Sequence, residues 1–362
     1  MGEAGRGKGP AREKEIEIEW DPNQGCLVVE TKQGLELGLS QFMFELSEGE
    51  VRVVGTDEVR QPELTITEMV FADSEPEARR FYEQNGSGVD VRAGSRPLLV
   101  TGKSSSDVVS GGSGNVQIDR RSGGVVVVNS YVRGNIFNRV NGGTGGTVII
   151  NGEQTGSSQS VSRGETQVVL RVPVANEGEQ SEYNSYIIRV NSGNIRIESV
   201  TGKYTISADA GDIVVEACNM VDSKIENKAG KTKVAAATLN VSEIKNKSGE
   251  IEVIGAKLNS CSIAGKTKNI AVVGTILNSC AITNQAGNIE VTDGIFIGEN
   301  AFNTRAGNIS VKFGRGQGEI EVKASVGGHA TQKLFFEGVE NPNGQTARLS
   351  LTTQDGEIKV NE

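Results

Sequence analysis

Apolar and polar residues alternate in short runs along most of this chain, and one such run recurs at a nearly constant interval between residues 191 and 320. The run begins with a small residue or Gly and continues polar, Ile, polar, Val, as in Gly249 to Val253 and Gly287 to Val291. Successive copies are offset by 18, 19, 19, 38 and 20 residues, and the copy missing from the longest step lies at Lys268 to Val272, where only the Gly is absent. Alternation with a period of two, using β-branched residues, predicts strands that bury one face.

A fixed repeat period of this size is the signature of a solenoid, in which each unit buries its apolar residues against the units before and after it. Repeats built from helix pairs need about 33 or more residues. The sequence therefore predicts an all-β fold, a parallel β-solenoid with coils of about 19 residues. Three apolar columns are expected inside it: Ile195, Ile213, Thr232, Ile251, Ile270, Ile289 and Ile309; Met220, Leu239, Leu258 and Leu277; and Ile225, Ile244, Ile263, Ile282 and Phe302.

Polar residues at the outward positions fit the same register. Neighbouring stacked strands lie about 4.8 Å apart, and opposite charges that face each other there are favourable. The expected pairs are Lys224 with Glu243, Glu226 with Lys245, Lys231 with Glu250, and Lys233 with Glu252. Two Asn columns are expected at the corners, where amides can hydrogen-bond along the stack: Asn240, Asn259 and Asn278; and Asn227, Asn246, Asn284 and Asn303.

Four further regions surround the regular solenoid of residues 191–320. Residues 1–14 are polar and Gly-rich and are expected to be a disordered tail. Residues 15–100 hold the only Trp and predict a small β-rich domain with one short helix, Glu75 to Gln84, begun by a capping box of Ser74 and Glu77. Residues 101–190 carry looser repeats at intervals of 10 to 12, which leaves an irregular solenoid start and a meander both open. Residues 321–362 predict a C-terminal cap, with bulky residues at Leu334 to Phe336.

The strands expected in residues 15–100 are short alternating runs separated by turn residues. They are Ile16 to Trp20, Cys26 to Glu30, Leu35 to Leu39, Phe42 to Leu46, Val51 to Val54 and Leu64 to Val70.

Composition and charge narrow the class of protein. A net charge of −9 argues against nucleic acid as a partner, because binding it requires clustered Lys and Arg. No run approaches about 18 apolar residues, so no membrane span is predicted. The first ten residues have no apolar stretch of the kind found in secretory signals. We therefore expect a cytoplasmic protein, or one at a cell or particle surface if it is exported or assembled by another route.

Few residues are available for metal or nucleophilic chemistry. Four Cys do not make a disulfide framework in 362 residues. Cys261 and Cys280 follow Ser223 and Ser242 in one inward column, and we expect reduced, buried thiols there. The single histidine, His329, lies in a Gly-rich segment that predicts a surface loop. No catalytic, metal or cofactor-binding residue is predicted.

Three motifs resemble functional sites in part. Gly230-Lys-Thr and Gly265-Lys-Thr are similar to the end of a phosphate-binding loop, but they lack the earlier Gly and the following helix. The segment from Gly111 to Asp119 is similar to a calcium-binding nonapeptide, with Val116 where an Asp is needed. Glu252 and Glu290 are outward carboxylates two turns apart, roughly 9.6 Å along the stack, and an inverting glycosidase pair there stays open.

The repeated Gly-Asn/Asp/Glu-Ile-x-Val motif and the closing segment Ala347 to Val360 resemble bacterial β-strand-repeat proteins catalogued as candidate adhesins. The resemblance covers residues 100–360, implies a β-solenoid and suggests surface adhesion. A weaker similarity is to bactofilins, cytoplasmic β-helical proteins that polymerise end to end. Residues 15–100 match neither family.

Three functions follow from these observations. The chain is predicted to be a non-enzymatic structural or assembly protein, a rigid scaffold with protein partners or copies of itself. The alternatives are a surface adhesin or carbohydrate-binding protein, which the scarcity of aromatic residues disfavours, and a polysaccharide-active enzyme, which the scarcity of acid–base groups disfavours. Within the first function, residues 15–100 are expected to dock partners, and the solenoid to hold them apart by about 35 Å.

Overall fold

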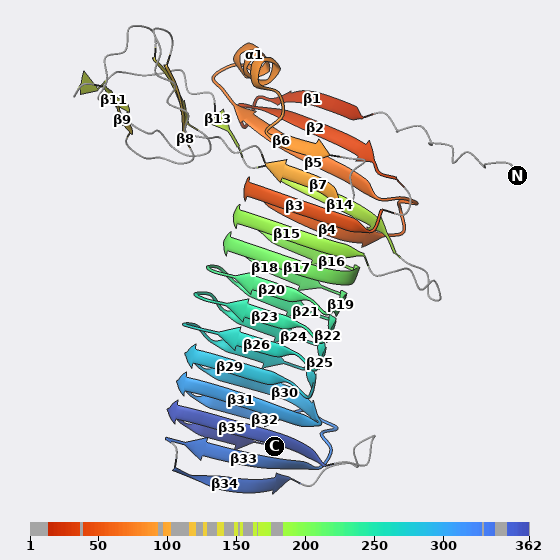
Figure 1. Ribbon diagram of the computed structural model, residues 1–362, viewed down its shortest axis with the longest axis vertical. Coiled ribbons are helices and arrows are strands. Elements are labelled where there is room, and N and C mark those ends of the chain that lie inside the picture. Colours follow the sequence, from red (N-terminus) through yellow and green to blue (C-terminus); the bar gives the residue numbers. More distant parts are fainter. Residues whose placement is uncertain are drawn as a thin grey trace, which may run out of the picture.

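The computed structural model shows a long stack of strands with one end built from the N-terminal residues and the other from the C-terminal residues (Figure 1). It describes residues 14–36, 39–92, 97–102, 162–164, 166–174, 184–327 and 346–361. For the strands between residues 116 and 154, and for residues 329–336, it describes the backbone alone. The predicted all-β fold, a parallel β-solenoid, is confirmed.

Two sheets run the length of the stack. Sheet A consists, in spatial order, of β1 (Glu15–Asp21), β2 (Cys26–Gly34), β5 (Glu63–Phe71), β14 (Gln167–Pro173), β4 (Glu50–Thr56), β16 (Ile195–Glu198), β18 (Ile213–Glu216), β21 (Thr232–Ala235), β24 (Ile251–Ile254), β27 (Ile270–Val273), β30 (Ile289–Ile297), β32 (Ile309–Phe313) and β36 (Ile358–Asn361). Sheet B consists of β6 (Val89–Arg92), β7 (Leu98–Gly102), β3 (Gln41–Glu48), β15 (Ser185–Ser192), β17 (Thr201–Ala210), β20 (Lys224–Asn227), β23 (Glu243–Asn246), β26 (Ser262–Gly265), β29 (Ala281–Ala286), β31 (Glu299–Ala306), β35 (Ala347–Asp355), β33 (Ile320–Val326) and β34 (His329–Phe336).

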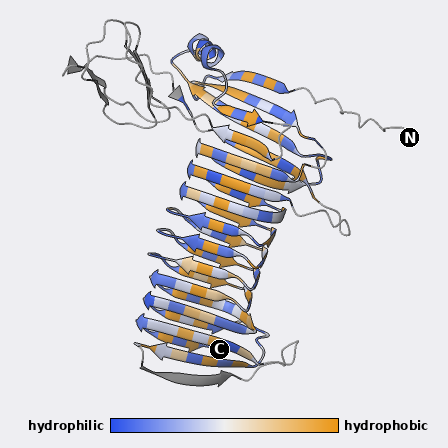
Figure 2. Cartoon of the chain, viewed as in Figure 1, coloured by the Kyte–Doolittle hydropathy of each residue, from blue (hydrophilic) through white to orange (hydrophobic). Residues whose placement is uncertain are grey.

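A third, shorter sheet closes the coils in the middle of the stack. Sheet C consists of the start of β17, then β19 (Asn219–Val221), β22 (Thr238–Asn240), β25 (Lys257–Asn259), β28 (Ile276–Asn278) and the end of β30. The three predicted apolar columns are confirmed in register, one on each sheet. Phe302 pairs with Ile282 at an offset of 20, as expected for a longer turn. Figure 2 shows the resulting alternation of hydrophobic and hydrophilic positions along the strands.

Each regular coil has three corners, and the backbone conformation differs between them. At one corner Gly230 has φ +116°, and a Cβ there would lie 2.0 Å from the carbonyl oxygen of Gly211 in the coil below. The other two corners are left-handed but open, since side chains are tolerated at Ala236 (φ 49°) and Val241 (φ 50°). Steric crowding therefore favours Gly only at the first corner, which explains why Gly begins most copies of the repeat; Lys268, which stands at this corner in one coil, is not among the residues with positive φ.

The stack begins earlier in the sequence than the repeat does. β3 pairs in parallel with β15, and β4 pairs in parallel with β16, so residues 41–56 form a coil beneath the regular ones. Phe42, Tyr186 and Tyr204 stack at ring-centroid distances of 5.2 and 4.8 Å. One hydrophobic core runs from Leu35 to Leu351. The expected domain boundary at residue 100 stays a prediction, and a cut there would divide this shared core.

Sheet B consequently contains thirteen strands among the described residues. At about 4.8 Å per strand spacing, the rod is roughly 60 Å long. The expected length of about 35 Å is too short, because it counted only the coils that the repeat reveals.

At both ends of the stack the order of the strands in space differs from their order in the sequence. At the N-terminal end β5, β2 and β1 add to sheet A in antiparallel fashion, and α1 (Glu75–Asn85) packs on them through Ala78, Phe81 and Tyr82. At the C-terminal end β35 lies between β31 and β33, and β34 forms a hairpin with β33 beyond them. This hairpin follows the last coil in space but precedes β35 and β36 in sequence. The expected cap of residues 321–362 stays a prediction.

Several local expectations differ from the structure. α1 spans Glu75–Asn85 and ends at Gly86 as predicted, but Ser74 makes no side-chain capping hydrogen bond, so the capping box does not form. Leu35 and Glu36 lie outside a strand, because β2 ends at Gly34. His329 begins β34 and pairs with Val326 of β33, rather than lying in a loop.

The looser repeats of residues 101–190 fall mainly outside the described residues. The described strands are β8 (Val116–Arg120), β9 (Val126–Val128), β10 (Ile136–Val140), β11 (Val148–Ile150), β12 (Glu153–Gln154) and β13 (Ser162–Arg163). β8 pairs in parallel with β10, and β9 pairs in parallel with β11. Parallel pairing of alternate strands is the arrangement of solenoid coils, and it favours that interpretation over a meander.

Candidate functional site

Strand β1, at the N-terminal edge of sheet A, is the most exposed of the strands whose side chains the structure describes. Its sequence alternates Glu and Ile up to Trp20. β1 pairs with β2 along one edge, and no described strand pairs with its other edge. Residues Glu15–Glu19 are all exposed, and Ile16 and Ile18 keep 50% and 38% of their surface accessible. An open strand edge of this kind presents unpaired backbone N–H and C=O groups at every second residue.

The Ile side chains of β1 share a face with a small apolar cluster. Antiparallel register places Ile18 opposite Val29 and Trp20 opposite Leu27, and residues directly opposite each other lie on the same face. Leu27 and Val29 belong to the cluster that α1 covers, with Trp20 packed at its border. The cluster therefore continues along β1 as an apolar strip formed by Ile16, Ile18 and Trp20, in which the two Ile are exposed and Trp20 is half-buried.

The opposite face of β1 is acidic. Glu15, Glu17 and Glu19 point to this face together with Glu30 of β2. Lys32 pairs with Glu30 at 2.6 Å. Its pKa is raised, first by the hydrogen bond to Glu30 and then by the charges of Glu30, Glu17 and Glu15. The field at this edge is thus negative enough to favour a bound cation.

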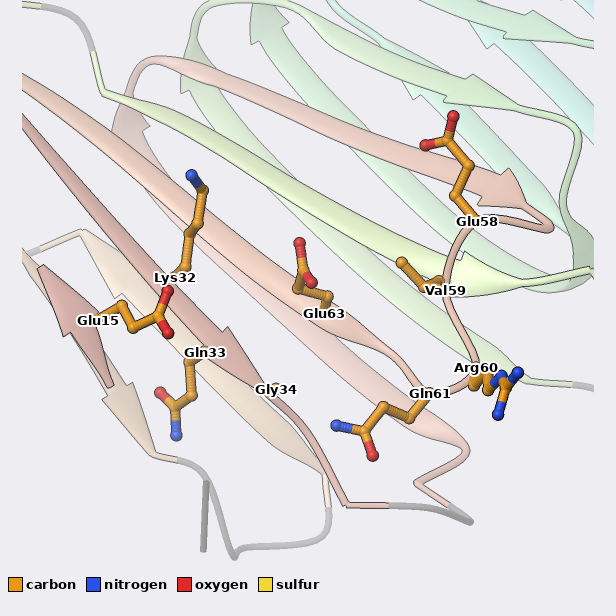
Figure 3. A pocket seen from close by; sticks show the side chains of 9 residues that line it. All are labelled: Glu15, Lys32, Gln33, Gly34, Glu58, Val59, Arg60, Gln61 and Glu63. Carbon is orange, nitrogen blue, oxygen red and sulfur yellow. The ribbon is translucent and has the colours of Figure 1, made fainter. Parts of the chain in front are cut away.

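A wide polar depression of about 620 Å³ lies near the start of β1, on the side that pairs with β2 (Figure 3). It is lined by Glu15 of β1, residues 32–34 of β2, residues 58–61 after β4, and Glu63 of β5. Glu63 is held by Arg171 at 3.3 Å, while Glu58 and Arg60 are exposed. The lining contains neither His nor Cys, and its apolar side chains are few, so the depression offers charge and hydrogen bonds to a peptide more readily than an enclosed site for catalysis.

A buried ion pair fixes the helix beside this edge. The Arg163 guanidinium lies 2.9 Å from the Glu68 carboxylate, donates to the Gly86 carbonyl oxygen and sits 5.8 Å from the centroid of the Phe81 ring. The Glu68 side chain is only 5% exposed. The Gly88 N–H also donates to Glu68. Burial of both charges with several hydrogen bonds gives a rigid support behind the apolar strip.

On the outer faces of the coils, by contrast, charged side chains form ion pairs with one another. The predicted register is confirmed, with Lys224 opposite Glu243, Glu226 opposite Lys245, and Lys233 opposite Glu252. The expected ion-pair partners are wrong, however. The pairs that form are Lys224–Glu226, Lys245–Glu243 and Lys231–Glu252, at 3.2, 2.6 and 2.7 Å. Long flexible side chains on one face reach a neighbour two residues along the strand or a diagonal neighbour as readily as the residue directly opposite.

Both Asn columns have structural roles. Asn259 donates to Asn240 at 2.8 Å, and Asn278 donates to Asn259 at 3.4 Å. In the second column the buried amides donate to corner carbonyl oxygens, as Asn246 does to Gly230 at 2.8 Å. Asn303 does not belong to that column, because Thr304 pairs with Asn284 and donates to Gly287 instead.

The motifs that resemble known sites lie apart from one another. Lys231 is committed to Glu252, and its backbone N–H donates to Asp212. Thr232 is fully buried, which leaves no phosphate site at this corner. Gly265 ends β26, and the Thr267 hydroxyl donates to Lys247. Of the segment from Gly111 to Asp119, residues 111–115 lie outside the described part of the chain.

Glu252 and Glu290 keep the predicted register, with Ala271 between them. Glu252 is engaged in an ion pair with Lys231 at 2.7 Å, so it is not a free side chain opposite Glu290. Among the described residues there is no group of three or more His, Cys, Asp or Glu that could hold a metal ion. The expected absence of catalytic and metal sites stays a prediction.

All four cysteines are free and buried. Cys261 and Cys280 donate to the carbonyl oxygens of Asn259 and Asn278 at 3.3 and 3.4 Å. Ser242 makes the same bond to Asn240 at 2.9 Å. The hydrogen bond with the Cys261 sulfur, together with burial, raises the pKa of the Cys280 thiol. Both thiols fill space in the column and donate to backbone carbonyl oxygens, as Ser242 does.

The edge of β1 was not singled out by the sequence. The alternation from Glu15 to Trp20 predicts a strand, but it does not show which edge of the strand is free. The aromatic residues of the region expected to dock partners, residues 15–100, lie in different places. Phe42 and Phe44 are buried in the main core, whereas Trp20, Phe81 and Tyr82 are partly buried at the border of the small cluster that α1 covers.

No helix among the described residues is long and apolar enough to cross a membrane. No curated protein matches this sequence. A solved structure, that of a candidate cell adhesion protein from Clostridium sporogenes ATCC 15579, aligns over 96% of this chain and 99% of its own, at 10% identity and a TM-score of 0.18. A likeness this distant supports no argument about function. The family model for Toastrack DUF4097 matches residues 143–362, which is more than half of the chain. The chain therefore belongs to the Toastrack DUF4097 family, in agreement with the β-strand-repeat resemblance.

Proposed function

We propose that the protein is a non-enzymatic structural protein, a rigid scaffold that joins a larger assembly through its N-terminal end. The observation that supports this proposal most directly is the contrast between the open, apolar edge of β1 and the self-paired outer faces of the coils. A continuous core from Leu35 to Leu351 makes the solenoid a spacer, and the N-terminal end is its contact surface.

The geometry disfavours unaided end-to-end growth of the solenoid. At the N-terminal end α1 lies over the inner face of β2 and β5, where the next molecule's coil would have to stack. At the C-terminal end β33 and β34 extend sheet B beyond β36, the last strand of sheet A. Side-on or edge contacts through β1 are therefore preferred over coaxial stacking.

A carbohydrate-binding adhesin is the weaker candidate. Sugar sites commonly use exposed aromatic faces, whereas between residues 184 and 327 every Tyr and Phe, namely Tyr186, Tyr204, Phe296, Phe302 and Phe313, is buried. An adhesin that binds a protein at the N-terminal end is compatible with the proposal, because it uses the same surface.

The proposal is tested by association of the full chain in native material. We expect Ile18→Lys, which places a charge on the apolar strip, to reduce the size of the particles seen by light scattering and electron microscopy. Glu290→Lys, an exposed change on the coils, is the matched control and should leave association unchanged. If Ile18→Lys assembles as the unaltered chain does, the contact surface has to be placed elsewhere.

A further inference from the structure

The free edge of β1 combines three properties that together define what can pair with it. Its second edge has no strand partner among the described residues. One of its faces carries the apolar strip of Ile16, Ile18 and Trp20, and the other carries Glu15, Glu17 and Glu19. A strand that adds to such an edge gains backbone hydrogen bonds from the edge and side-chain selectivity from the two faces.

The edge is unusual in keeping apolar residues uncovered. Exposed edge strands are commonly protected by charged residues, and the three Glu side chains act in that way on the acidic face. On the other face Ile16 and Ile18 retain 50% and 38% of their surface, and the buried cluster of Leu27, Val29, Val70 and Ala78 stops beside them. An incoming strand with apolar residues at alternate positions would extend that cluster by another row.

A second copy of the chain fits this edge poorly. If two β1 strands pair in antiparallel fashion with their apolar faces on the same side, Glu residues stand opposite acidic residues in every register that keeps the faces aligned. Centred on Ile18, for example, the pairs are Glu17 with Glu19 and Glu15 with Asp21. Like charges directly opposite each other destabilise a strand pair, so self-pairing through β1 is disfavoured.

The negative charge around β1 favours a basic partner. Between residues 14 and 34 there are five carboxylates, at Glu15, Glu17, Glu19, Asp21 and Glu30, and two ammonium groups, at Lys14 and Lys32. Lys32 is already paired with Glu30. A partner that brings Lys or Arg to the acidic face would face three carboxylates with no competing cation of the β1 strand itself, and cross-strand pairs of opposite charge are favourable.

We propose that β1 accepts, by strand addition, an extended protein segment in which basic and apolar residues alternate. The apolar residues of the segment lie beside Ile16, Ile18 and Trp20, and its basic residues lie beside Glu15, Glu17 and Glu19. This inference rests on the proposed function, since it names the partner of the N-terminal surface.

The test uses the full chain and a synthetic peptide, Lys-Val-Lys-Val-Lys-Val-Lys, blocked at both ends and as long as β1. Trp20 is the only Trp of the protein, so its fluorescence reports on this edge alone. We expect a saturable change in Trp20 emission, weakened by added salt, and slower amide hydrogen exchange within β1. A peptide with Glu in place of Lys should not bind, and neither should one with Pro in place of the central Val, because Pro cannot donate a backbone hydrogen bond.

The charge on β1 provides the matched variants. Glu17→Lys combined with Glu19→Lys should weaken binding of the basic peptide by at least about tenfold and confer binding of the acidic one. Glu250→Lys combined with Glu290→Lys makes the same change in net charge on exposed coil positions and should leave binding unchanged. Equal binding by both double variants, or binding of the Pro peptide, would overturn strand addition at β1.

Other occupants of the edge give distinct results. A dimer of the unaltered chain that disappears with Glu17→Lys and Glu19→Lys would show self-pairing and overturn the proposal. So would a chain beginning at Lys14 that binds the peptide when the full chain does not, because the first residues would then occupy the edge. If Ile18→Lys reduces assembly but the basic peptide fails to bind, the proposed function stands and this inference fails.

Discussion

The regular coils and the N-terminal end of the molecule bury the same kinds of side chain by different means. In the coils each strand pairs with the strand one repeat earlier and one repeat later, as β24 does with β21 and β27. At the N-terminal end β4 pairs with β14 and β16, which lie more than a hundred residues further along the sequence. Periodicity therefore specifies the coils, whereas the N-terminal end depends on contacts that no local pattern records.

The surfaces of the two regions also differ in how their polar and apolar groups are paired or covered. Outward charges on the coils pair with one another, and the Asn column along β22, β25 and β28 is hydrogen-bonded from rung to rung. At the N-terminal end a buried ion pair supports a strand whose outer edge and apolar face are uncovered. This contrast is the basis of our proposal that the N-terminal end, rather than the coils, makes contacts with partners.

The largest expected effect is on the core of the coils. Val272→Asp places a carboxylate at a fully buried position with no cation nearby, and should lower the free energy of unfolding by about 4 kcal/mol or more. Glu290→Lys, at an exposed position on the neighbouring strand β30, should change the free energy of unfolding little. Urea denaturation followed by circular dichroism measures both. Equal losses would show that the assignment of inward and outward positions is wrong.

The second-largest effect on stability is expected from loss of the ion pair at the N-terminal end. Arg163→Met leaves the Glu68 carboxylate buried without its partner, and we expect a loss of about 3 kcal/mol. The loss should be local, so hydrogen exchange should increase in α1 and β5 more than in the coils. Arg348→Met removes the exposed pair with Glu299 and serves as the control. If exchange rises equally throughout the chain, the N-terminal end does not unfold as a separate unit.

Substitution of Gly at two different corners tests the steric explanation of the repeat. Gly230→Ala would put a Cβ 2.0 Å from the Gly211 carbonyl oxygen, so the stack must shift, and we expect a loss of about 2 kcal/mol. At Gly255 (φ +58°) no atom lies within 4 Å of the added Cβ, and Ala236 already adopts this conformation one coil away. Gly255→Ala should therefore cost much less. Thermal melts that rank the two substitutions in the opposite order would refute the steric explanation.

Replacing the buried thiols should affect stability less than the substitutions at the corners. Replacing both Cys261 and Cys280 by Ser keeps the hydrogen bond that Ser242 already makes in the same column, so we expect a loss of about 1 kcal/mol. Mass spectrometry of freshly alkylated protein should find both thiols reduced. A disulfide-linked peptide pair would contradict this prediction.

The smallest expected effect is an increase in stability. Val241 holds φ 50° while 64% of its surface is exposed, so its side chain contributes strain and little burial. Val241→Asn should raise the free energy of unfolding by about 0.5–1 kcal/mol, because Asn tolerates the left-handed region better. An unchanged or lower melting temperature would show that Val241 contributes packing that outweighs its strain.

How much the sequence specified can be judged from particular residues. The columns through Ile251, Leu258 and Ile263, the Asn240 ladder and the helix that ends at Gly86 were all predictable, because each depends on spacing along the chain or on a local signal. The Gly corner was also visible as the first residue of each repeat. Stacked strands repeat the same environment, so the sequence repeats with them.

The tertiary structure decided what lies beside the N-terminal strands. Phe42 stacks on Tyr186, Glu68 pairs with Arg163, and β35 inserts between β31 and β33. These partners are far apart in sequence, and alternation shows only that a strand has an apolar face, not which strand covers it. The free edge of β1 follows from the same limitation, because whether an edge is paired is a property of the assembled sheet and not of the strand.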